Sequence, residues 1–307
     1  QEKSPRSTWK KQTDPQLMDV FNGKLTLDEF INQLSDEEMV RMLGGQPNRG
    51  VANTYGFGNL PRCGIPNVMT ADGPAGLRIK PGRGVTTTAF PCATLLACTW
   101  NTGLVREIGA AGAREVHENG IGVWLTPAIN IHRTPLCGRN FEYYSEDPLV
   151  AGKMAAAMVE GIQSQGVGAS LKHFACNNKE GYRTDSDSRV SERALREIYL
   201  KGFEICVKKA QPLTVMSSYN LLNGLWASQN RELLTDILRG EWGFEGMVTT
   251  DWYTHAPQYT EIAAGNDVKM GCGDPAHTLK MMREGKLNRE DVKTSVKRLL
   301  EMILKLA

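Results

Sequence analysis

The sequence predicts an α/β fold, a (β/α)8 barrel of the TIM type. Short apolar, β-branched runs that end in polar residues alternate with segments of helical periodicity, which is the pattern of parallel βα units. The length of 307 residues suits one barrel of roughly 250 residues with terminal additions. A doubly wound sheet would alternate similarly, but no Gly-x-Gly-x-x-Gly turn follows the first strand and no Walker loop is present. We therefore expect a barrel, with irregular early strands.

We divide the chain into an N-terminal wrapping segment, residues 1–34, and a barrel domain, residues 35–307. The first twenty residues are polar and mixed in charge, and helical signals run from 25 to 43. A loop rich in Gly and Asn is expected over 44–58. The first predicted strand, 67–72, ends in an aspartate and is followed at once by a Gly-Pro turn.

The middle of the chain continues the alternation. A second short apolar run at 92–97 precedes a helix predicted over 102–119, whose apolar residues recur at steps of three and four and which stops at Gly120. A strand is expected at 121–125. The long segment 129–147 that follows is polar and aromatic; loops of this length are usually functional or disordered, and this one is too aromatic for disorder.

The second half repeats the same pattern and brings the total to six or seven strands. Helices are predicted at 147–165, 191–210 and 231–242, and strands at 169–174, 213–220, 247–250 and 267–270. A charged loop spans 177–190, and two helices close the chain. In the last helix, Asn288 is the expected cap of a stripe formed by Val292, Val296, Leu299 and Ile303.

Composition excludes several classes of function. The 36 basic and 34 acidic side chains give a net charge of +2, far from the basic field that binds nucleic acid. No apolar run approaches about 18 residues, so no membrane span is predicted, and residues 1–20 are too polar for a signal peptide. The chain opens at Gln1 without an initiator methionine, so a cleaved or truncated leader stays open.

The cysteines are scattered and form no CxxC pair. We expect them to be mostly small core residues of a protein in a reducing, cytoplasmic compartment, although a secreted or periplasmic location stays open. No metal and no cofactor is predicted. The seven positions are Cys63, Cys92, Cys98, Cys137, Cys176, Cys206 and Cys272.

The strand at 247–250 ends in Asp251, which aromatic residues follow. Catalytic groups in βα barrels come from the carboxyl ends of strands, so Asp251 is our candidate nucleophile. The alternative is that Asp251 only caps the helix that follows, as Asp often does. Local sequence alone does not decide between the two.

Polar groups at successive strand ends converge on one face of a barrel, so Asp72, Lys172, His173, Tyr219 and Asp251 are expected to border one pocket. Met216 would supply an apolar wall. Lys172 and His173 can donate hydrogen bonds to hydroxyl groups and Asp72 can accept them, which suits an uncharged polyol. Structural alternatives remain: Lys172 pairs with a structural carboxylate, Tyr219 belongs to the core, or Asp72 caps the Gly-Pro turn.

Five motifs, in order along the chain, resemble those of the barrel domain of glycoside hydrolase family 3. The resemblance runs from about Leu34 to Met270 and is strongest to bacterial β-glucosidases. The signature Lys-His-Phe-Pro-Gly-His-Gly of the single-domain β-N-acetylglucosaminidases is absent, because Ala175-Cys176-Asn177-Asn178 follows Phe174. The motifs are Thr70-Ala-Asp72-Gly-Pro-Ala-Gly, Gly138-Arg139-Asn-Phe-Glu142, Leu171-Lys172-His173-Phe174, Val215-Met-Ser-Ser-Tyr219-Asn220 and Val248-Thr-Thr-Asp251-Trp252.

The resemblance implies a retaining β-glycosidase that hydrolyses terminal, nonreducing β-D-glucosyl residues of a β-glucoside or oligosaccharide. Asp251 would form the glycosyl-enzyme, and Lys172 and Arg139 would favour its ionised form. Asp72, Arg139, Lys172 and His173 match positions that hold sugar hydroxyls in the family. Met216 and Tyr219 match wall positions, and Trp252 matches a neighbour at the mouth.

A retaining enzyme needs a second carboxyl about 5–5.5 Å from the nucleophile. In the family's multi-domain β-glucosidases this acid comes from a separate α/β sandwich domain, for which 307 residues leave no room. We therefore expect a fragment or one part of a split enzyme. The internal candidates for the acid are better explained as loop or salt-bridge residues; they are Glu142, Glu180, Asp185 and Asp187.

Two further functions are considered. The first is a carbohydrate-binding barrel that has little catalysis because the acid is missing. The second is an unrelated barrel enzyme, such as an aldolase with Lys172 as its Schiff-base amine. Neither a nucleic acid nor a membrane is expected as a partner.

Overall fold

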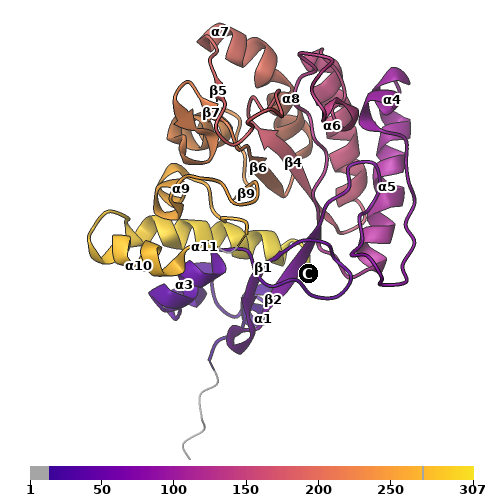
Figure 1. The fold of residues 1–307 in the computed structure, drawn as a ribbon. Helices are drawn as coiled ribbons and strands as arrows, with labels where there is room; N and C mark the ends of the chain where they lie inside the picture. Colours follow the sequence, from indigo (N-terminus) through magenta and orange to yellow (C-terminus); the bar gives the residue numbers. More distant parts are fainter. Residues whose placement is uncertain (1–13, 272) are drawn as a thin grey trace, which may run out of the picture.

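The computed structural model describes residues 14–271 and 273–307, in which helices surround a curved, mainly parallel sheet (Figure 1). In this part of the chain the main sheet has six strands in the order β1-β2-β3-β4-β6-β9. Strand β1 pairs antiparallel with β2, and the other neighbours pair in parallel. The strands are β1 Gly56–Leu60, β2 Ile65–Ala71, β3 Val123–Trp124, β4 Gly168–Phe174, β6 Thr214–Ser217 and β9 Met247–Thr250.

Two short segments continue the sheet from β9 back to β1. Val268 forms a parallel bridge with Thr249 of β9, and Lys269 forms one with Gly44. The backbone N–H of Gln46 then donates to the carbonyl of Gly56 at 2.8 Å, in an antiparallel bridge to β1. Backbone hydrogen bonds therefore connect every neighbouring pair around a closed ring, and the predicted barrel is confirmed, with irregular early strands.

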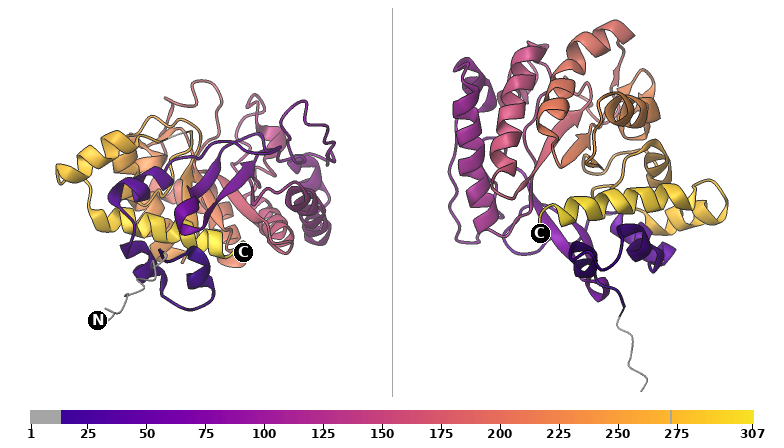
Figure 2. Two further views of the ribbon diagram at one scale, coloured as in Figure 1. Left: turned by 90° about the horizontal axis from the view of Figure 1, so that it is seen from below. Right: turned by 180° about the vertical axis from the view of Figure 1, so that it is seen from behind.

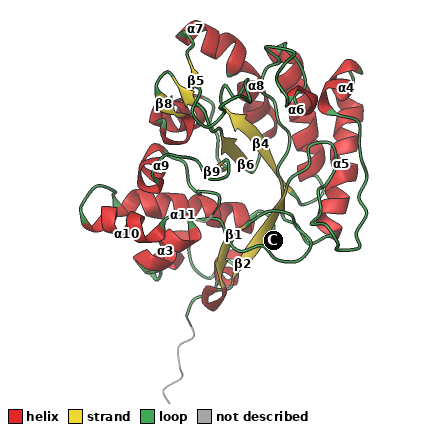
Figure 3. Ribbon diagram, viewed as in Figure 1, coloured by secondary structure: helices red, strands yellow, loops and turns green. Residues whose placement is uncertain are grey.

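Helices cover the outside of this ring, and α5, α6 and α8 lie side by side on it (Figure 3). Their backbones approach closely at glycines: a Cβ on Gly161 of α6 would lie 2.1 Å from the carbonyl oxygen of Arg106 on α5. The helices are α1 Leu17–Phe21, α2 Leu27–Asn32, α3 Asp36–Met42, α4 Ala93–Cys98, α5 Thr102–Glu118, α6 Pro148–Gln163, α7 Glu192–Ala194, α8 Lys201–Ala210, α9 Gln258–Ala264, α10 Pro275–Arg283 and α11 Arg289–Leu304.

Shorter elements lie in the connections. A three-stranded sheet, described as β5-β7-β8, forms beyond the ends of β4 and β6. Two helical stretches have π-type hydrogen bonding, which interrupts the helix predicted at 191–210 and forms all of the one predicted at 231–242. The segments are β5 Asp187–Ser188, β7 Leu221–Leu222, β8 Leu225–Trp226, η1 Pro61–Cys63, η2 Asn140–Glu142, η3 Leu195–Tyr199, η4 Ala227–Gln229 and η5 Glu232–Glu241.

Three predicted elements differ from the structure. The helical stretch at 25–43 is two helices, because Ser35 accepts a hydrogen bond from the Glu38 N–H and starts α3 with a capping box. The apolar run at 92–97 forms helix α4, since periodicity alone cannot separate a short buried helix from a strand. The loop expected at 44–58 contributes a bridge and the start of β1, and a glycine-rich segment gives no strand signal.

The last helix, α11, packs against the N-terminal helices α2 and α3 (Figure 2). The predicted stripe is confirmed, since Val292, Val296 and Leu299 are fully buried and Ile303 nearly so. Asn288 occupies the N-cap position, but its side chain makes no capping hydrogen bond. No helix in the described residues is both long and apolar enough to span a bilayer.

The six cysteines that the structure describes are all free thiols. Four of them are buried, as predicted, and Cys92 and Cys98 are more accessible. Cys272, and the first thirteen residues of the predicted wrapping segment, lie outside the described residues.

Asp267 joins the last part of the ring to two surrounding helices. This carboxylate is fully buried. It accepts hydrogen bonds from Arg239 at 2.8 Å and Arg298 at 3.0 Å, from the Ser295 hydroxyl at 2.9 Å and from the Val248 N–H at 2.8 Å. The two arginines neutralise its charge, and the four donors satisfy both of its oxygens.

We predict that Asp267→Ala lowers the free energy of unfolding by about 3–5 kcal/mol, because the substitution leaves Arg239 buried without its partner. Urea unfolding, followed by circular dichroism, measures the loss. Asp28→Ala is the matched control, because it breaks an exposed ion pair with Lys297 and should cost less than about 1 kcal/mol. Equal losses in the two variants would contradict the prediction.

Candidate active site

A cavity of about 400 Å³ opens at the carboxyl ends of the parallel strands. Asp72 follows β2, Met216 lies in β6 and Asp251 follows β9. Of the predicted site residues, all but Tyr219 line the cavity: Asp72, Arg139, Lys172, His173, Met216, Asp251 and Trp252. The structure thus brings together residues that are far apart in the sequence, as the barrel prediction required.

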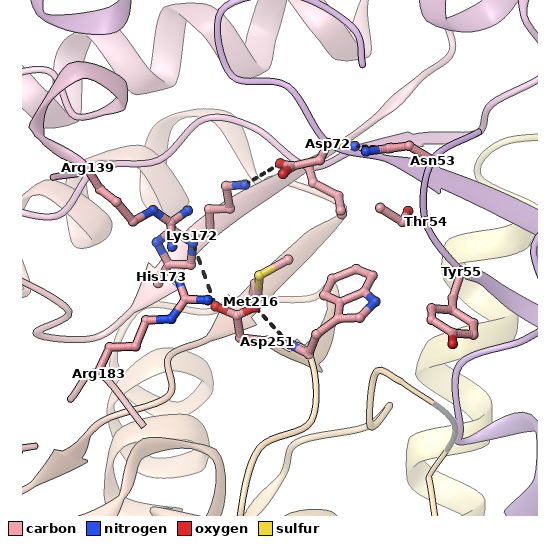
Figure 4. Close-up of a pocket in the computed structure, with 12 residues that line it drawn as sticks. Asn53, Thr54, Tyr55, Asp72, Arg139, Lys172, His173, Arg183, Met216 and Asp251 are labelled. Atoms are coloured by element: carbon pink, nitrogen blue, oxygen red, sulfur yellow. Dashed lines mark hydrogen bonds and ion pairs between the residues drawn. The ribbon is translucent and has the colours of Figure 1, made fainter. Parts of the chain in front are cut away.

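Lys172 and His173 both reach the cavity, although they are consecutive residues of β4 (Figure 4). Neighbouring side chains of a regular strand point to opposite faces. The register between β4 and β6 shifts between Lys172 and Phe174, and such an irregularity redirects side chains. This shift lets one strand supply two polar groups to one pocket.

Asp251 has the environment of a reactive carboxylate. Its side chain is one-tenth exposed. Oδ1 accepts a hydrogen bond from the Trp252 N–H at 2.8 Å, whereas Oδ2 has no hydrogen-bond partner in the described structure and lies 3.8 Å from Nε2 of His173 (Figure 4). Helix α9 begins only at Gln258, after Pro257 at its N-cap. The alternative that Asp251 caps the next helix is therefore wrong.

Opposing effects act on the protonation of Asp251. Burial raises the pKa of the carboxyl above its ordinary value, whereas the Trp252 N–H and the charges of Arg139, Lys172 and Arg183 lower it. Lys172 and Arg139 do favour the ionised form, as the sequence suggested. Burial outweighs them, so the net direction of the pKa shift is upward.

Asp72 and Lys172 form an ion pair of 2.7 Å at the other side of the cavity (Figure 4). Burial alone would raise the pKa of Asp72, but the charge and hydrogen bond of Lys172, with the Gly73 N–H and Arg78, lower it to about 2. The predicted pairing of Lys172 with a carboxylate is thus real, and the partner is itself a cavity residue. The carboxylate of Asp72 also accepts a hydrogen bond from the Gly73 N–H at the start of the Gly-Pro turn. Asp72 therefore stabilises this turn and lines the cavity at the same time.

His173 is almost fully buried. Burial, and then the charges of Arg139, Lys172 and Arg183, lower its pKa well below the ordinary value. Since each of these effects disfavours an added proton, the imidazole is neutral near pH 7.

Tyr219 is buried and is not among the residues that line the cavity. Its ring faces the Arg183 guanidinium, which lies 4.8 Å from the ring centre. Burial and the neighbouring Asp251 carboxylate raise the pKa of its phenol. Tyr219 is therefore a buried residue, as the core alternative held, but one that supports two groups of the site.

Five further residues line the cavity and were not predicted from the sequence. Arg183 lies in the loop at 177–190, whose charge was noted but not linked to the pocket. The side chain of Asn53 accepts a hydrogen bond from the Asp72 N–H at 3.0 Å. Residues in loops show no periodic pattern from which a role can be predicted. The run of polar and aromatic residues Asn53-Thr54-Tyr55 is the one sequence feature that could have indicated a site there. The five are Asn53, Thr54, Tyr55, Leu125 and Arg183.

Among the described residues, Asp72 and Asp251 are the only carboxylates that line the cavity. The four internal candidates for a general acid do not line the cavity, and each lies against a basic side chain: Glu142 at Arg139, Glu180 at Arg183, Asp185 at His255 and Asp187 at Arg189. Asp72 keeps its proton only at very low pH and is a poor acid near neutrality. In the same part of the chain, no group of three or more His, Cys, Asp or Glu side chains could hold a metal ion.

The chain is similar to known proteins over most of its length. The profile of the family described as "Glycosyl hydrolase family 3 N terminal domain" matches residues 58–302. β-Glucosidase A of Butyrivibrio fibrisolvens is 58% identical over 283 residues, which are 92% of this chain and 34% of that protein. An exo-α-(1→6)-L-arabinopyranosidase of Bifidobacterium longum is 49% identical over 216 residues, 67% of this chain and 28% of the relative.

The chain is also similar in structure to a solved β-glucosidase. The β-glucosidase 3B of Thermotoga neapolitana in complex with glucose superimposes with a TM-score of 0.87 at 46% identity, and the match covers 91% of this chain and 42% of that one. The chain spans about a third of the length of the curated relatives that it matches.

We predict that Lys172→Met raises the pKa of Asp72 well above its value of about 2, because Lys172 is the strongest of the groups that offset burial. NMR titration of ¹³C-labelled aspartate carboxyls measures this pKa. The control is Arg78→Met, which removes a more distant and exposed cation at 3.4 Å and should shift the pKa much less. A pKa unchanged in Lys172→Met would disprove the assigned cause.

Proposed function

Because the chain belongs to glycoside hydrolase family 3, we propose that it is the catalytic barrel of a retaining β-glucosidase with Asp251 as nucleophile. One observation carries the proposal: a buried carboxylate at a strand end turns an oxygen without a hydrogen-bond partner toward a cavity lined by polar groups. A carboxylate that accepted a sugar hydroxyl would also need a free oxygen, so this feature suits both catalysis and binding. The relatives that are named β-glucosidases favour catalysis over the carbohydrate-binding barrel.

The reaction would proceed in two displacements. Oδ2 of Asp251 attacks the anomeric carbon, the bond from that carbon to the leaving oxygen breaks, and a glycosyl ester forms. Water then attacks the same carbon and gives up a proton to the carboxylate that had protonated the leaving oxygen, the ester bond breaks, and Asp251 is released as a carboxylate. Each displacement inverts the anomeric centre, so the β configuration is retained.

The proton that the leaving oxygen needs would come from a carboxyl outside this chain. This proposal is supported by the absence of a second suitable carboxyl from the lining of the cavity in the described residues. The shorter length of the chain relative to its relatives is consistent with a further domain, which we propose to be an α/β sandwich. The barrel alone should then cleave only glycosides whose leaving group departs as an anion.

An uncharged sugar suits the charge balance of the cavity. Each of its three cations already has a carboxylate partner: Lys172 has Asp72, Arg139 has Glu142 and Arg183 has Glu180. A charged ligand would have to compete with these pairs. We assign Asp72 as an acceptor of sugar hydroxyls, the three cations as donors, Met216 as an apolar wall and Trp252 as part of the mouth.

One earlier alternative fits this site less well. An aldolase would need Lys172 as a free amine, whereas its ammonium is held by Asp72 at 2.7 Å. α-L-Arabinopyranosides are a second substrate class, favoured by the identity to the Bifidobacterium enzyme named for that activity. The predicted cytoplasmic location still rests on the cysteine pattern alone.

We predict that a 2-deoxy-2-fluoro-β-glucoside with a dinitrophenolate leaving group forms an adduct on Asp251. The fluorine slows hydrolysis of the ester, and the leaving group needs no acid. Peptide mass spectrometry locates the adduct, and Asp251→Asn is the control that should form none. Sugar binding without any adduct would support the carbohydrate-binding barrel instead. Preferential labelling by the corresponding arabinopyranosyl probe would show that the substrate is an arabinopyranoside and not a glucoside.

The raised pKa of Asp251 predicts how this labelling depends on pH. Only the carboxylate attacks, so the labelling rate should fall as pH falls through a pKa above 3.8. Arg183→Met removes a cation that favours the carboxylate, so the pH at which the labelling rate falls should move upward. Labelling rates measured over a range of pH values locate this acid limb, the part of the profile in which the rate falls as pH falls.

The control for this experiment is Arg189→Met, which removes an exposed arginine from the same loop that does not line the cavity. Its acid limb should coincide with that of the wild type. Equal limbs in the Arg183 variant and the wild type would show that Arg183 does not act on Asp251.

A further inference from the structure

Asn130 holds the backbone of His173 on both sides. Asn130 is almost fully buried and follows β3 in the sequence. Its Oδ1 accepts a hydrogen bond from the His173 N–H at 2.9 Å, and its Nδ2 donates to the His173 carbonyl at 2.8 Å. A backbone N–H can only donate and a carbonyl can only accept. The orientation of the Asn130 amide is therefore fixed by its partners, and Oδ1 cannot exchange places with Nδ2.

The same Oδ1 lies 3.3 Å from Nδ1 of the His173 ring. The other polar atom near Nδ1 is the Tyr143 hydroxyl oxygen at 3.5 Å. The Tyr143 hydroxyl can donate its hydrogen to the carbonyl of Asn177 at 3.4 Å, which leaves a lone pair toward the ring. Both groups that face Nδ1 can thus act as acceptors, and an acceptor requires a proton on the ring nitrogen.

The opposite ring nitrogen faces different surroundings. Nε2 points to the cavity, 3.8 Å from Oδ2 of Asp251 (Figure 4). A neutral imidazole carries one proton, and burial together with three nearby cations lowers the pKa of His173 and keeps it neutral. With that proton on Nδ1, Nε2 presents a lone pair to the cavity.

We propose that Asn130 is a positioning residue that fixes the Nδ1–H tautomer of His173 and so makes Nε2 an acceptor for one hydroxyl group of the sugar. The identity of the ligand rests on the proposed function, whereas the tautomer does not. The sequence suggested that His173 donates to the substrate; the contacts of Asn130 assign it the opposite role. Nε2 of His173 and Oδ2 of Asp251 are then two acceptors that lie 3.8 Å apart. A hydroxyl group of the ligand that donates its hydrogen to Nε2 would relieve the repulsion between their lone pairs.

This arrangement would make the site selective for a hydrogen-bond donor at one ring position. A hydroxyl donates to Nε2, whereas fluorine, an ether or an ester at the same carbon cannot. The substrate class is thus a pyranoside that is unsubstituted at the hydroxyl facing His173. Because the amide of Asn130 is anchored to the backbone, moving the proton from Nδ1 to Nε2 would leave a lone pair of Nδ1 facing Oδ1 of Asn130, also an acceptor.

The tautomer is tested first, on the chain without a ligand. Two-dimensional ¹H–¹⁵N NMR of ¹⁵N-histidine protein near pH 7 separates a protonated ring nitrogen from a bare one. His173→Gln identifies the signals by their loss. We expect His173 to show a protonated Nδ1 and a bare Nε2. A protonated Nε2 in the wild type would overturn the proposal, whatever the fate of the variants.

Asn130→Ala tests whether Asn130 sets the tautomer. We expect signal from the Nε2–H form to appear in this variant. Asn177→Ala is the matched control, because Asn177 is a buried asparagine in the same region whose side chain makes no hydrogen bond in the described structure, and it should keep the wild-type pattern. A folded Asn130→Ala with the wild-type pattern would show that Asn130 has no such role. If this variant fails to fold, the wild-type spectrum still decides the tautomer.

The ligand is tested separately, by calorimetric titration with glucose and with its monodeoxy and monodeoxyfluoro analogues. The hydroxyl that faces His173 is the one whose removal weakens binding in the wild type but not in His173→Gln. At that position we expect the fluoro analogue to bind as weakly as the deoxy analogue, because fluorine cannot donate. Tighter binding of the fluoro analogue would indicate an Nε2 donor and contradict the proposal. If no sugar binds but the Nδ1–H tautomer is found, the proposed substrate fails and the role of Asn130 stands.

Discussion

The burial of several charges in one cavity is the constraint on which this site depends. Ions lose much of their hydration in such a place and persist only when they are paired. Lys172, Arg139 and Arg183 each meet a carboxylate, and these pairs hold three side chains in fixed positions around the pocket. Asp251 has no such partner within salt-bridge distance other than the neutral His173, so its negative charge is the one that remains available.

The same constraint explains why two aspartates at strand ends differ in chemistry. Asp72 lies against a buried ammonium and has a pKa of about 2, so it is an acceptor at any working pH. Asp251 is more deeply buried, and the cations near it act from a greater distance than Lys172 acts on Asp72. Its pKa is raised, which costs some ionisation but keeps the carboxylate poorly solvated and basic. One environment thus suits binding and the other suits nucleophilic attack.

Backbone groups provide the fixed frame for the polar side chains. Asn130 is oriented by the N–H and carbonyl of His173, Asp251 by the Trp252 N–H, and Asn53 by the N–H of Asp72. These backbone groups belong to strands, or to the residues next to them, in a closed ring of hydrogen bonds. A side chain held by such groups loses little further freedom when a ligand binds, which is the physical meaning of a preorganised site.

The barrel, the strand at 247–250 and most of the groups that meet in the cavity could be predicted from the sequence, because a polar residue after a buried strand is a local pattern and parallel strands bring their ends to one face. The antiparallel start of the ring, the helix at 92–97 and the break at Ser35 within 25–43 could not be predicted. Only the contacts of the folded chain bring Arg183 and Asn53 to the cavity, bury Tyr219 beside Arg183 and Asp251, and point Lys172 and His173 the same way. These features depend on contacts between residues far apart in the chain and on a shift in strand register, and neither leaves a periodic trace in the sequence.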